Sequence, residues 1–300
     1  MLPNVFIPGA PKCGTTALAD YLSTHPAVFL GHIKEPNYWS SDMPFYARRE
    51  GLTDEDAYLE IYARAPRTAQ VAIDASTHYL FSDVAVARIT ARFPDARFIV
   101  CLRNQTQIAH AWHMQMVNAG YDTVADFYDA WQLVEQRKQG DAIPSSCPEP
   151  KLLDYGGIAS VGHQLQRLMQ HVERDRLHWV FLEDLKHDPR RCYLEILSFL
   201  GLDDDGRVEF KPSNPAFQNR SGLASRLARS PRLRPYVNRL LATIGPTATQ
   251  TVKSIAKRAL YRPAKRSPVD AGLLDSMQAR FAADNERLMA LTGRSFNSAG

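Results

Sequence analysis

Short unbroken apolar runs alternate along the chain with longer stretches in which apolar residues recur every three or four positions. Apolar runs without polar alternation are typical of strands that are buried on both faces of a parallel sheet. The strongest run, "ARFIVCL", is rich in the β-branched and aromatic residues that favour strands. The runs predict strands at Val5–Ile7, Ala27–Leu30, Val71–Ile73, Ala96–Leu102 and His178–Leu182.

The three- and four-residue spacing predicts helices between and after these strands. Strands that alternate with helices predict an α/β fold, here a three-layer sandwich in which a central, mostly parallel β-sheet is flanked by helices. The stretch Gly140–Gly157 is rich in Pro, Gly and Ser and is expected to be a long surface loop. The helices are expected at Thr15–Ser23, Asp54–Ala65, Val84–Phe93, Gln107–Val117, Val124–Lys138, Val161–Val172, Arg190–Leu200 and Asp270–Leu291.

Composition fits one domain over residues 1–300, because 45% hydrophobic residues can build a single large core. Its apolar runs are all shorter than the roughly 18–20 residues that a membrane span needs. The start "MLPNVFIPG" lacks the basic region and long apolar segment of a signal peptide. The four cysteines are widely spaced, which indicates reduced thiols rather than disulfides or a zinc site. We therefore expect a soluble, cytoplasmic protein.

Positive charge is concentrated in a basic segment at about 211–269, which holds thirteen Lys and Arg and no Asp or Glu. Such a block favours contact with an anionic partner, and it is equally typical of a solvated basic helical face. The part "YVNRLLATIG" also allows peripheral contact with a membrane surface. We expect an exposed pair of basic helices here and no nucleic-acid partner.

The first strand is followed by a candidate phosphate site in "FIPGAPKCGTTALADYL". The first N–H groups of a helix have no partner inside it, and together with the helix dipole they attract an anion. Gly14 allows close approach of the backbone, Thr15 and Thr16 add hydroxyl groups, and Lys12 adds a full charge. A glycine turn with a Thr N-cap would explain Gly14 and Thr15 but would leave Lys12 without a role. The order differs from the Walker pattern, which disfavours an ATPase or kinase.

Several motifs resemble the sulfotransferases that use 3′-phosphoadenosine 5′-phosphosulfate (PAPS), over about residues 4–202. "PKCGTT" resembles their 5′-phosphosulfate loop, and "HPAVFLGHIKEPNYW" resembles a segment of the glycan-type and bacterial members. "IDASTHYL", "ARFIVCLRNQ" and "VFLEDLKHDPRRCYLEILSFLGL" match further family segments in the same order. The resemblance implies the P-loop-like sulfotransferase fold and makes PAPS the co-substrate, with the desulfated nucleotide PAP as product.

The resemblance also assigns roles to individual residues that would bind the nucleotide. Lys12 would stabilise the charge that develops on the bridging oxygen as the sulfate leaves its phosphate. The Cys13 backbone together with Gly14, Thr15 and Thr16 would hold the 5′-phosphate. Arg103 would bind the 3′-phosphate, and Arg220, in the tail "NPAFQNRSGL", would contact the nucleotide.

The chain departs from the family pattern at two places that bear on these roles. Where members carry a serine as a second 3′-phosphate contact this chain has Ala111, so His110 or a residue of the basic segment would have to replace it. Many glycan-type members carry Lys at Ala75, next to the acidic residue Asp74. No metal is expected, because His110 and His113 lack a carboxylate at matching spacing.

Two residues compete for the role of the base that activates the acceptor. Glu35, in "KEPNYW", matches the carboxylate given this role in glycan-type members. His78, in "STHYL", lies where the small-molecule sulfotransferases carry a catalytic histidine. The ordinary alternative for Glu35 is a surface Glu paired with Lys34. We expect Glu35 to be the base, with His78 as the alternative.

The expected function is sulfuryl transfer from PAPS to a hydroxyl or amine of a carbohydrate-like or small acceptor. Two other functions stay open on the sequence. One is a nucleotide kinase-like phosphotransferase, and the other is a non-catalytic PAP-binding relative, which Ala111 and Ala75 would allow.

Overall fold

A five-stranded parallel sheet lies at the centre of the chain, with the strand order β2-β3-β1-β4-β5. The computed structural model describes residues 1–48, 50–211, 217–219, 261–263, 271–294 and 296. Every pairing in this sheet is parallel, and Val5 of β1 lies between Ile73 of β3 and Arg97 of β4. The strands are β1 (Val5–Phe6), β2 (Val28–Leu30), β3 (Val71–Asp74), β4 (Arg97–Leu102) and β5 (Leu177–Phe181). The strands that the apolar runs predicted are thus confirmed.

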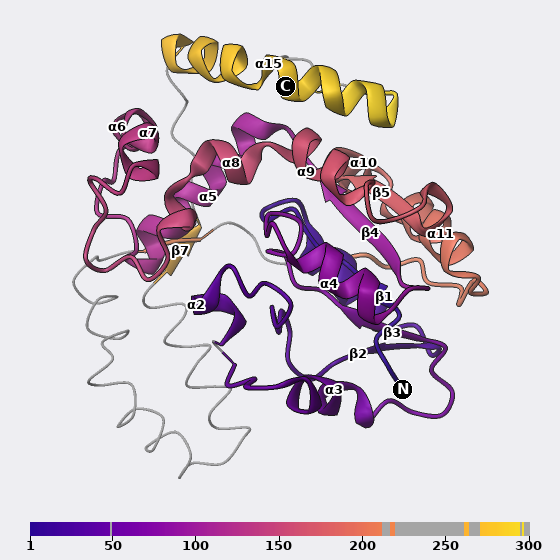
Figure 1. The fold of residues 1–300 in the computed structure, drawn as a ribbon. Helices are drawn as coiled ribbons and strands as arrows, with labels where there is room; N and C mark the ends of the chain where they lie inside the picture. Colours follow the sequence, from indigo (N-terminus) through magenta and orange to yellow (C-terminus); the bar gives the residue numbers. More distant parts are fainter. Residues whose placement is uncertain (49, 212–216, 220–260, 264–270, 295, 297–300) are drawn as a thin grey trace.

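Helices cover the sheet, which confirms the layered α/β fold (Figure 1). Their bounds are α1 (Thr15–Leu22), α2 (Pro44–Ala47), α3 (Glu55–Ala63), α4 (Ala85–Arg92), α5 (Gln105–Ala119), α6 (Phe127–Gln132), α7 (Val134–Lys138), α8 (Tyr155–Ala159), α9 (Val161–Leu168), α10 (Leu182–His187), α11 (Pro189–Leu200) and α15 (Ala271–Thr292). Two 3₁₀ turns, η1 (Pro150–Leu153) and η2 (Arg174–Arg176), complete the described helical elements.

Local capping explains where the helical predictions differ from the structure. The helix expected over residues 124–138 is two short helices, which are separated at Leu133. The first begins after Asp126, which caps it by accepting a hydrogen bond from Asp129 N at 3.1 Å. The surface loop expected over residues 140–157 is wrong in its second half. Leu152 and Leu153 are completely buried there. Trp112 Nε1 donates to the Leu152 carbonyl oxygen at 2.8 Å, which fixes this turn against α5.

The C-terminal helix α15 packs along α9 and α5 and lies outermost in its layer (Figure 1). Its Asp284 is 6% exposed and accepts from the backbone N–H groups of Gly162 (3.0 Å) and His163 (2.7 Å). These N–H groups belong to the first turn of α9, where helices lack internal partners. The Ser160 N-cap makes no side-chain cap of its own, so Asp284 caps α9 from another helix. Asp284 also accepts from Gln105 Nε2 at 3.1 Å and so joins α15 to the start of α5.

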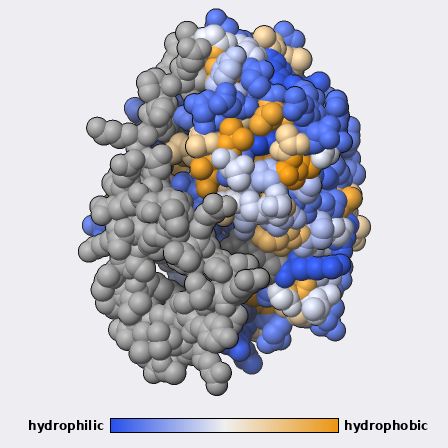
Figure 2. Space-filling model, turned by 90° about the vertical axis from the view of Figure 1, so that its left-hand side faces the viewer, coloured by the Kyte–Doolittle hydropathy of each residue, from blue (hydrophilic) through white to orange (hydrophobic). Residues whose placement is uncertain are grey.

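The described parts of the basic segment form a two-stranded antiparallel sheet, in which β6 (Phe217–Asn219) pairs with β7 (Tyr261–Pro263). The helix pair expected in this segment lies outside the described residues. All four cysteines are free thiols, as the spacing predicted. Over the part of the chain that the structure describes, no helix has the length and apolarity that crossing a bilayer requires. Among the coloured, described residues of the face in Figure 2, apolar residues lie in small groups between hydrophilic ones.

Removing the charge of Asp284 tests whether α15 stabilises the fold through the cap. We expect Asp284→Asn to lower the free energy of unfolding by about 1–3 kcal/mol, since charge-assisted bonds to two helix N–H groups are weakened. Urea unfolding followed by circular dichroism measures this. Asp275→Asn is the matched control, because Asp275 is an exposed residue on the same helix. Equal stability of the two variants would contradict the capping role.

Candidate active site

Each strand of the parallel sheet delivers a segment to the same edge, because the carboxyl ends of parallel strands lie together. Lys12 follows β1, Glu35 follows β2, His78 follows β3 and Arg103 follows β4. The helix after β5 also reaches this edge. A Cβ on Gly14 would lie 2.7 Å from Leu182 Cδ1 of α10. The structure therefore brings segments far apart in sequence to one edge of the sheet.

The loop over residues 7–14 joins β1 to α1. It is hydrogen-bonded to β4 and to the segment that follows β3. Ala10 N donates to the Cys101 carbonyl at 2.9 Å, and Cys101 N donates to the Gly9 carbonyl at 2.8 Å. Leu80 N, in the segment after β3, donates to the Pro8 carbonyl at 2.8 Å. Gly14 is the N-cap of α1 with φ 90°, a left-handed conformation that suits glycine. The first turn of α1 is thereby held in place, with N–H groups that would suit an anion.

Lys12 is held at both of its ends. Its backbone has φ 65°, and its carbonyl oxygen accepts from Arg103 Nη1 at 3.0 Å. Its ammonium Nζ donates to Gln115 Oε1 of α5 at 3.1 Å. The side chain is exposed, so the ammonium stays accessible from the edge of the sheet.

Arg103 is buried, at 3% exposure, directly after β4. Its Nε donates to Gln107 Oε1 at 3.0 Å, while its Nη1 contacts Lys12. Asn104 next to it caps α5, because its Oδ1 accepts from Gln107 N at 3.2 Å. The residues "RNQTQ" therefore end the strand, begin the helix and direct the guanidinium toward the loop after β1.

Cys13 can serve a ligand only through its backbone. Its side chain is completely buried, with Sγ 3.4 Å from the Pro11 carbonyl oxygen. Burial raises the pKa of the Cys13 thiol well above its ordinary value, so the group stays neutral. The hydroxyl of Thr16 lies in the first turn of α1, where it accepts from Lys34 Nζ at 2.7 Å. This contact joins the segment after β2 to the phosphate loop.

Glu35 is half-buried and lies one residue after Lys34. It has φ 58°, and Asn37 has φ 52°. Asn37 Nδ2 donates to the Glu35 carbonyl at 2.7 Å, and Asn37 N donates to Ser76 Oγ at 2.9 Å. Two left-handed residues so close together cost free energy, and these bonds offset that cost. The segment after β3 thus determines the backbone conformation at Glu35.

Asp74 anchors this arrangement from the end of β3. Ser76 Oγ donates to its Oδ1 at 2.6 Å, and the hydroxyls of Tyr58 and Tyr79 donate to its Oδ2 at 2.8 and 2.9 Å. The residue is 1% exposed. Burial raises the pKa of Asp74 to about 6, although the three hydroxyl donors oppose this shift. Asp74 is therefore a buried carboxyl that titrates near neutrality.

His78 lies in an aromatic enclosure rather than on the surface. It is 2% exposed, and its ring stacks on Tyr46 with centroids 3.9 Å apart. Trp112 of α5 packs edge-on against it at 5.6 Å. Sequence analysis missed this enclosure, because Tyr46 and Trp112 come from distant segments.

His110 and His113 of α5 pack against Phe127, with ring centroids 4.9 and 5.3 Å away. Burial lowers the pKa of His113, whose Nε2 lies 2.9 Å from the Val124 carbonyl oxygen. Among the described residues, no group of His, Cys, Asp and Glu could hold a metal. Arg220, the other predicted nucleotide contact, lies outside the described residues.

Sequence analysis also missed Gln107 and Gln115, which contact Arg103 and Lys12. The signal that could have found them is their spacing, because residues 107, 111 and 115 share one face of a helix. Ala111, in the place of the expected serine, lies between the two glutamines on this face and is buried.

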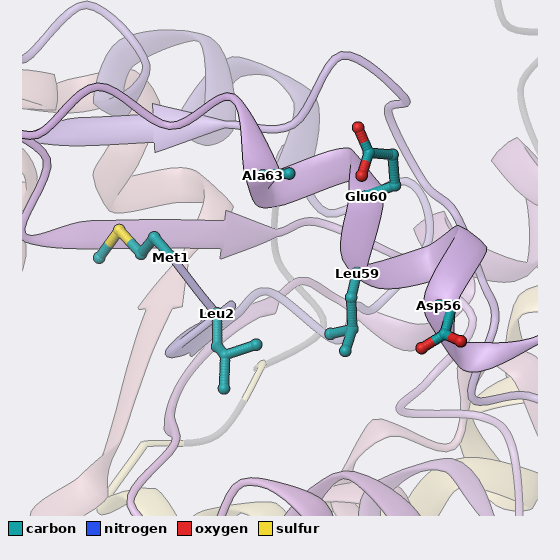
Figure 3. Close-up of a pocket in the computed structure, with 6 residues that line it drawn as sticks. All are labelled: Met1, Leu2, Asp56, Leu59, Glu60 and Ala63. Carbon is teal, nitrogen blue, oxygen red and sulfur yellow. The ribbon is translucent and has the colours of Figure 1, made fainter.

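A cavity of about 420 Å³ elsewhere on the molecule is not this site (Figure 3). Met1 and Leu2, which precede β1, line it together with residues of α3. The phosphate loop follows β1, so the cavity lies at the opposite end of that strand.

Comparison with known proteins agrees with this geometry. The model of the family described as "Sulfotransferase domain" matches residues 2–226. A crystal structure of a sulfotransferase from Alicyclobacillus acidocaldarius superposes with a TM-score of 0.70 at 23% identity, covering 99% of this chain and 98% of that one. This likeness confirms the fold.

Two curated relatives carry names that mention carbohydrates. A bifunctional heparan sulfate N-deacetylase/N-sulfotransferase 1 of Caenorhabditis briggsae is 22% identical over 218 residues, 71% of this chain. Human carbohydrate sulfotransferase 15 is 39% identical over 80 residues, 25% of this chain. The chain spans only 24% and 14% of the lengths of these two relatives.

The raised pKa of Asp74 predicts a pH dependence of stability. Between about pH 4 and 6 the folded state retains a proton that the unfolded carboxyl, with a pKa near 3.9, has lost. Raising the pH through this window therefore lowers the free energy of unfolding. A difference of about two pKa units corresponds to roughly 3 kcal/mol.

We expect Asp74→Asn to lack this dependence, so its stability relative to the parent should rise by about 3 kcal/mol from pH 4 to pH 7. Urea unfolding at a series of pH values measures the difference. Asp56→Asn, at an exposed position of α3, is the control. A relative stability of Asp74→Asn that is flat with pH would show that the carboxyl does not titrate in this range.

Proposed function

The chain belongs to the sulfotransferase domain family, and we propose that it transfers the sulfuryl group of PAPS to a hydroxyl or amine of a carbohydrate-like acceptor. Membership makes it an enzyme with PAPS as co-substrate and PAP as product. The observation that carries the proposal is the hydrogen bond from Arg103 to the Lys12 carbonyl. It joins the two segments that would hold the two ends of the nucleotide.

The donor would lie across the edge of the sheet between α1 and Arg103. The N–H groups at the start of α1, with the hydroxyls of Thr15 and Thr16, would bind the 5′-phosphate. The buried guanidinium of Arg103 suits a bidentate contact with the 3′-phosphate. Lys12 would lie at the oxygen that bridges sulfur and phosphorus.

Sulfuryl transfer resembles phosphoryl transfer, in which positioning and charge stabilisation supply most of the catalysis. The acceptor oxygen or nitrogen attacks sulfur in line, and the bond from sulfur to the bridging oxygen breaks with its electron pair on that oxygen. The ammonium of Lys12 stabilises the charge that develops there. The acceptor proton passes to the base, and PAP and the sulfated acceptor are the products.

Glu35 is the base in this proposal, with His78 as the alternative. The side chain of Lys34, the residue before Glu35, reaches the first turn of α1, where its Nζ donates to the Thr16 hydroxyl. The half-buried carboxylate of Glu35 has access to an acceptor, whereas the ring of His78 is enclosed by Tyr46 and Trp112.

The acceptor class rests on the names of the relatives. Parts of this chain are similar to a heparan sulfate N-deacetylase/N-sulfotransferase and to a carbohydrate sulfotransferase. Both names favour a saccharide hydroxyl or amine. Family membership does not favour a non-catalytic PAP-binding role, although Ala111 and Ala75 lack polar groups. Family membership does not favour a nucleotide kinase.

The first prediction of the proposal concerns the 3′-phosphate. We expect Arg103→Gln to weaken PAP binding about 10- to 100-fold, because a charge-assisted contact is worth about 1.5–3 kcal/mol. Adenosine 5′-phosphosulfate lacks the 3′-phosphate and cannot make this contact. Its binding should therefore change less than about threefold, the effect of a weak neutral hydrogen bond at most. Isothermal calorimetry measures both. Equal weakening of the two nucleotides would contradict the assignment of Arg103.

The second prediction identifies the base. We expect Glu35→Gln to lower the turnover of ³⁵S-labelled PAPS with oligosaccharide acceptors by about 10²–10⁴-fold, with unchanged PAP affinity. His78→Phe keeps an aromatic ring against Tyr46 and should retain most of the turnover. Loss of turnover in His78→Phe, together with normal turnover in Glu35→Gln, would assign the base to His78 instead.

A further inference from the structure

The helix α5 controls both ends of Lys12. The lysine carbonyl accepts from Arg103, whose guanidinium is in turn held by Gln107 Oε1 of α5 at 3.0 Å. The lysine ammonium donates directly to Gln115 Oε1 of α5 at 3.1 Å. The two glutamines are eight residues apart and lie on one helix face, with the small side chain of Ala111 between them. One face of α5 thus fixes the backbone and the side chain of the same lysine.

We propose that Gln115 is a positioning residue for Lys12, which holds the ammonium over the phosphate loop ready for the nucleotide. This inference rests on the proposed function, because it gives Lys12 the nucleotide as its ligand. Gln115 would not itself be a catalytic residue. It would act only through the lysine.

An amide oxygen suits this task better than a carboxylate. A lysine ammonium has three N–H donors and no acceptor. The bond to Gln115 uses one donor and leaves the positive charge intact, whereas a carboxylate partner would neutralise it. This charge can then act on the oxygens of a phosphate or sulfate group.

Holding the side chain before the ligand arrives also has an energetic consequence. A lysine side chain loses up to about 2 kcal/mol of rotamer entropy when it is immobilised. A lysine that is already held by Gln115 loses less on binding, so the nucleotide binds more tightly. Because Gly14 and Arg103 hold the loop backbone, the orientation of the ammonium is the remaining variable.

The experiment is a double-mutant cycle between Gln115 and Lys12, with PAP as the probe and calorimetry as the readout. Gln115→Met keeps the length of the side chain but removes its oxygen. We expect it to weaken PAP binding about three- to tenfold, the effect of losing roughly one hydrogen bond. In the Lys12→Met background, where no ammonium remains, the same substitution should change PAP binding less than twofold, within about the error of additivity.

Gln136→Met is the matched control, because Gln136 is an exposed glutamine on α7. This variant should bind PAP as tightly as the parent does. An equal loss in both Lys12 backgrounds, or tighter binding of PAP by Gln115→Met, would overturn the positioning role. A parent protein that does not bind PAP at all would overturn the proposed function as well. A parent that binds PAP without coupling between the two positions would overturn this inference alone.

Discussion

The hydrogen bond from Arg103 to the backbone of Lys12 joins segments that are 91 residues apart in the chain. It is possible only because β1 and β4 are adjacent and parallel, so that the residues after them meet at one edge of the sheet. The buried guanidinium and the backbone bonds of Cys101 to Gly9 and Ala10 hold the loop from the side of β4. The bond from Leu80 N to the Pro8 carbonyl holds it from the side of β3. These bonds hold the start of α1 in place, where its first N–H groups would suit an anion.

A second network at the same edge shapes the acceptor side. Asp74 and Ser76 after β3 support Asn37, and Asn37 supports the left-handed backbone of Glu35. The carboxyl of Asp74 is buried, which raises its pKa. Through Ser76 and Asn37, this buried carboxyl supports the backbone conformation of the candidate base. The contact of Lys34 with Thr16 links this network to the first turn of α1.

The sequence predicted the strands and the phosphate loop because local patterns encode them. Unbroken apolar runs determine buried strands, and "PKCGTT" places a glycine at the N-cap of α1. The capping of α9 by Asp284 could not be predicted, because it depends on a helix more than a hundred residues away. The enclosure of His78 and the contact of Gln115 with Lys12 are likewise tertiary contacts without a local signal. The roles of all the predicted site residues, Lys12 and Arg103 included, remain predictions.

The central claim is that the loop after β1 and the arginine after β4 bind the same nucleotide. A crystal structure of the protein with PAP bound tests it most directly. The account predicts the 5′-phosphate at the first turn of α1, within hydrogen-bond distance of the backbone at residues 14–16, and the 3′-phosphate against the Arg103 guanidinium. A nucleotide bound away from this edge, or with its 3′-phosphate turned away from Arg103, would contradict the account.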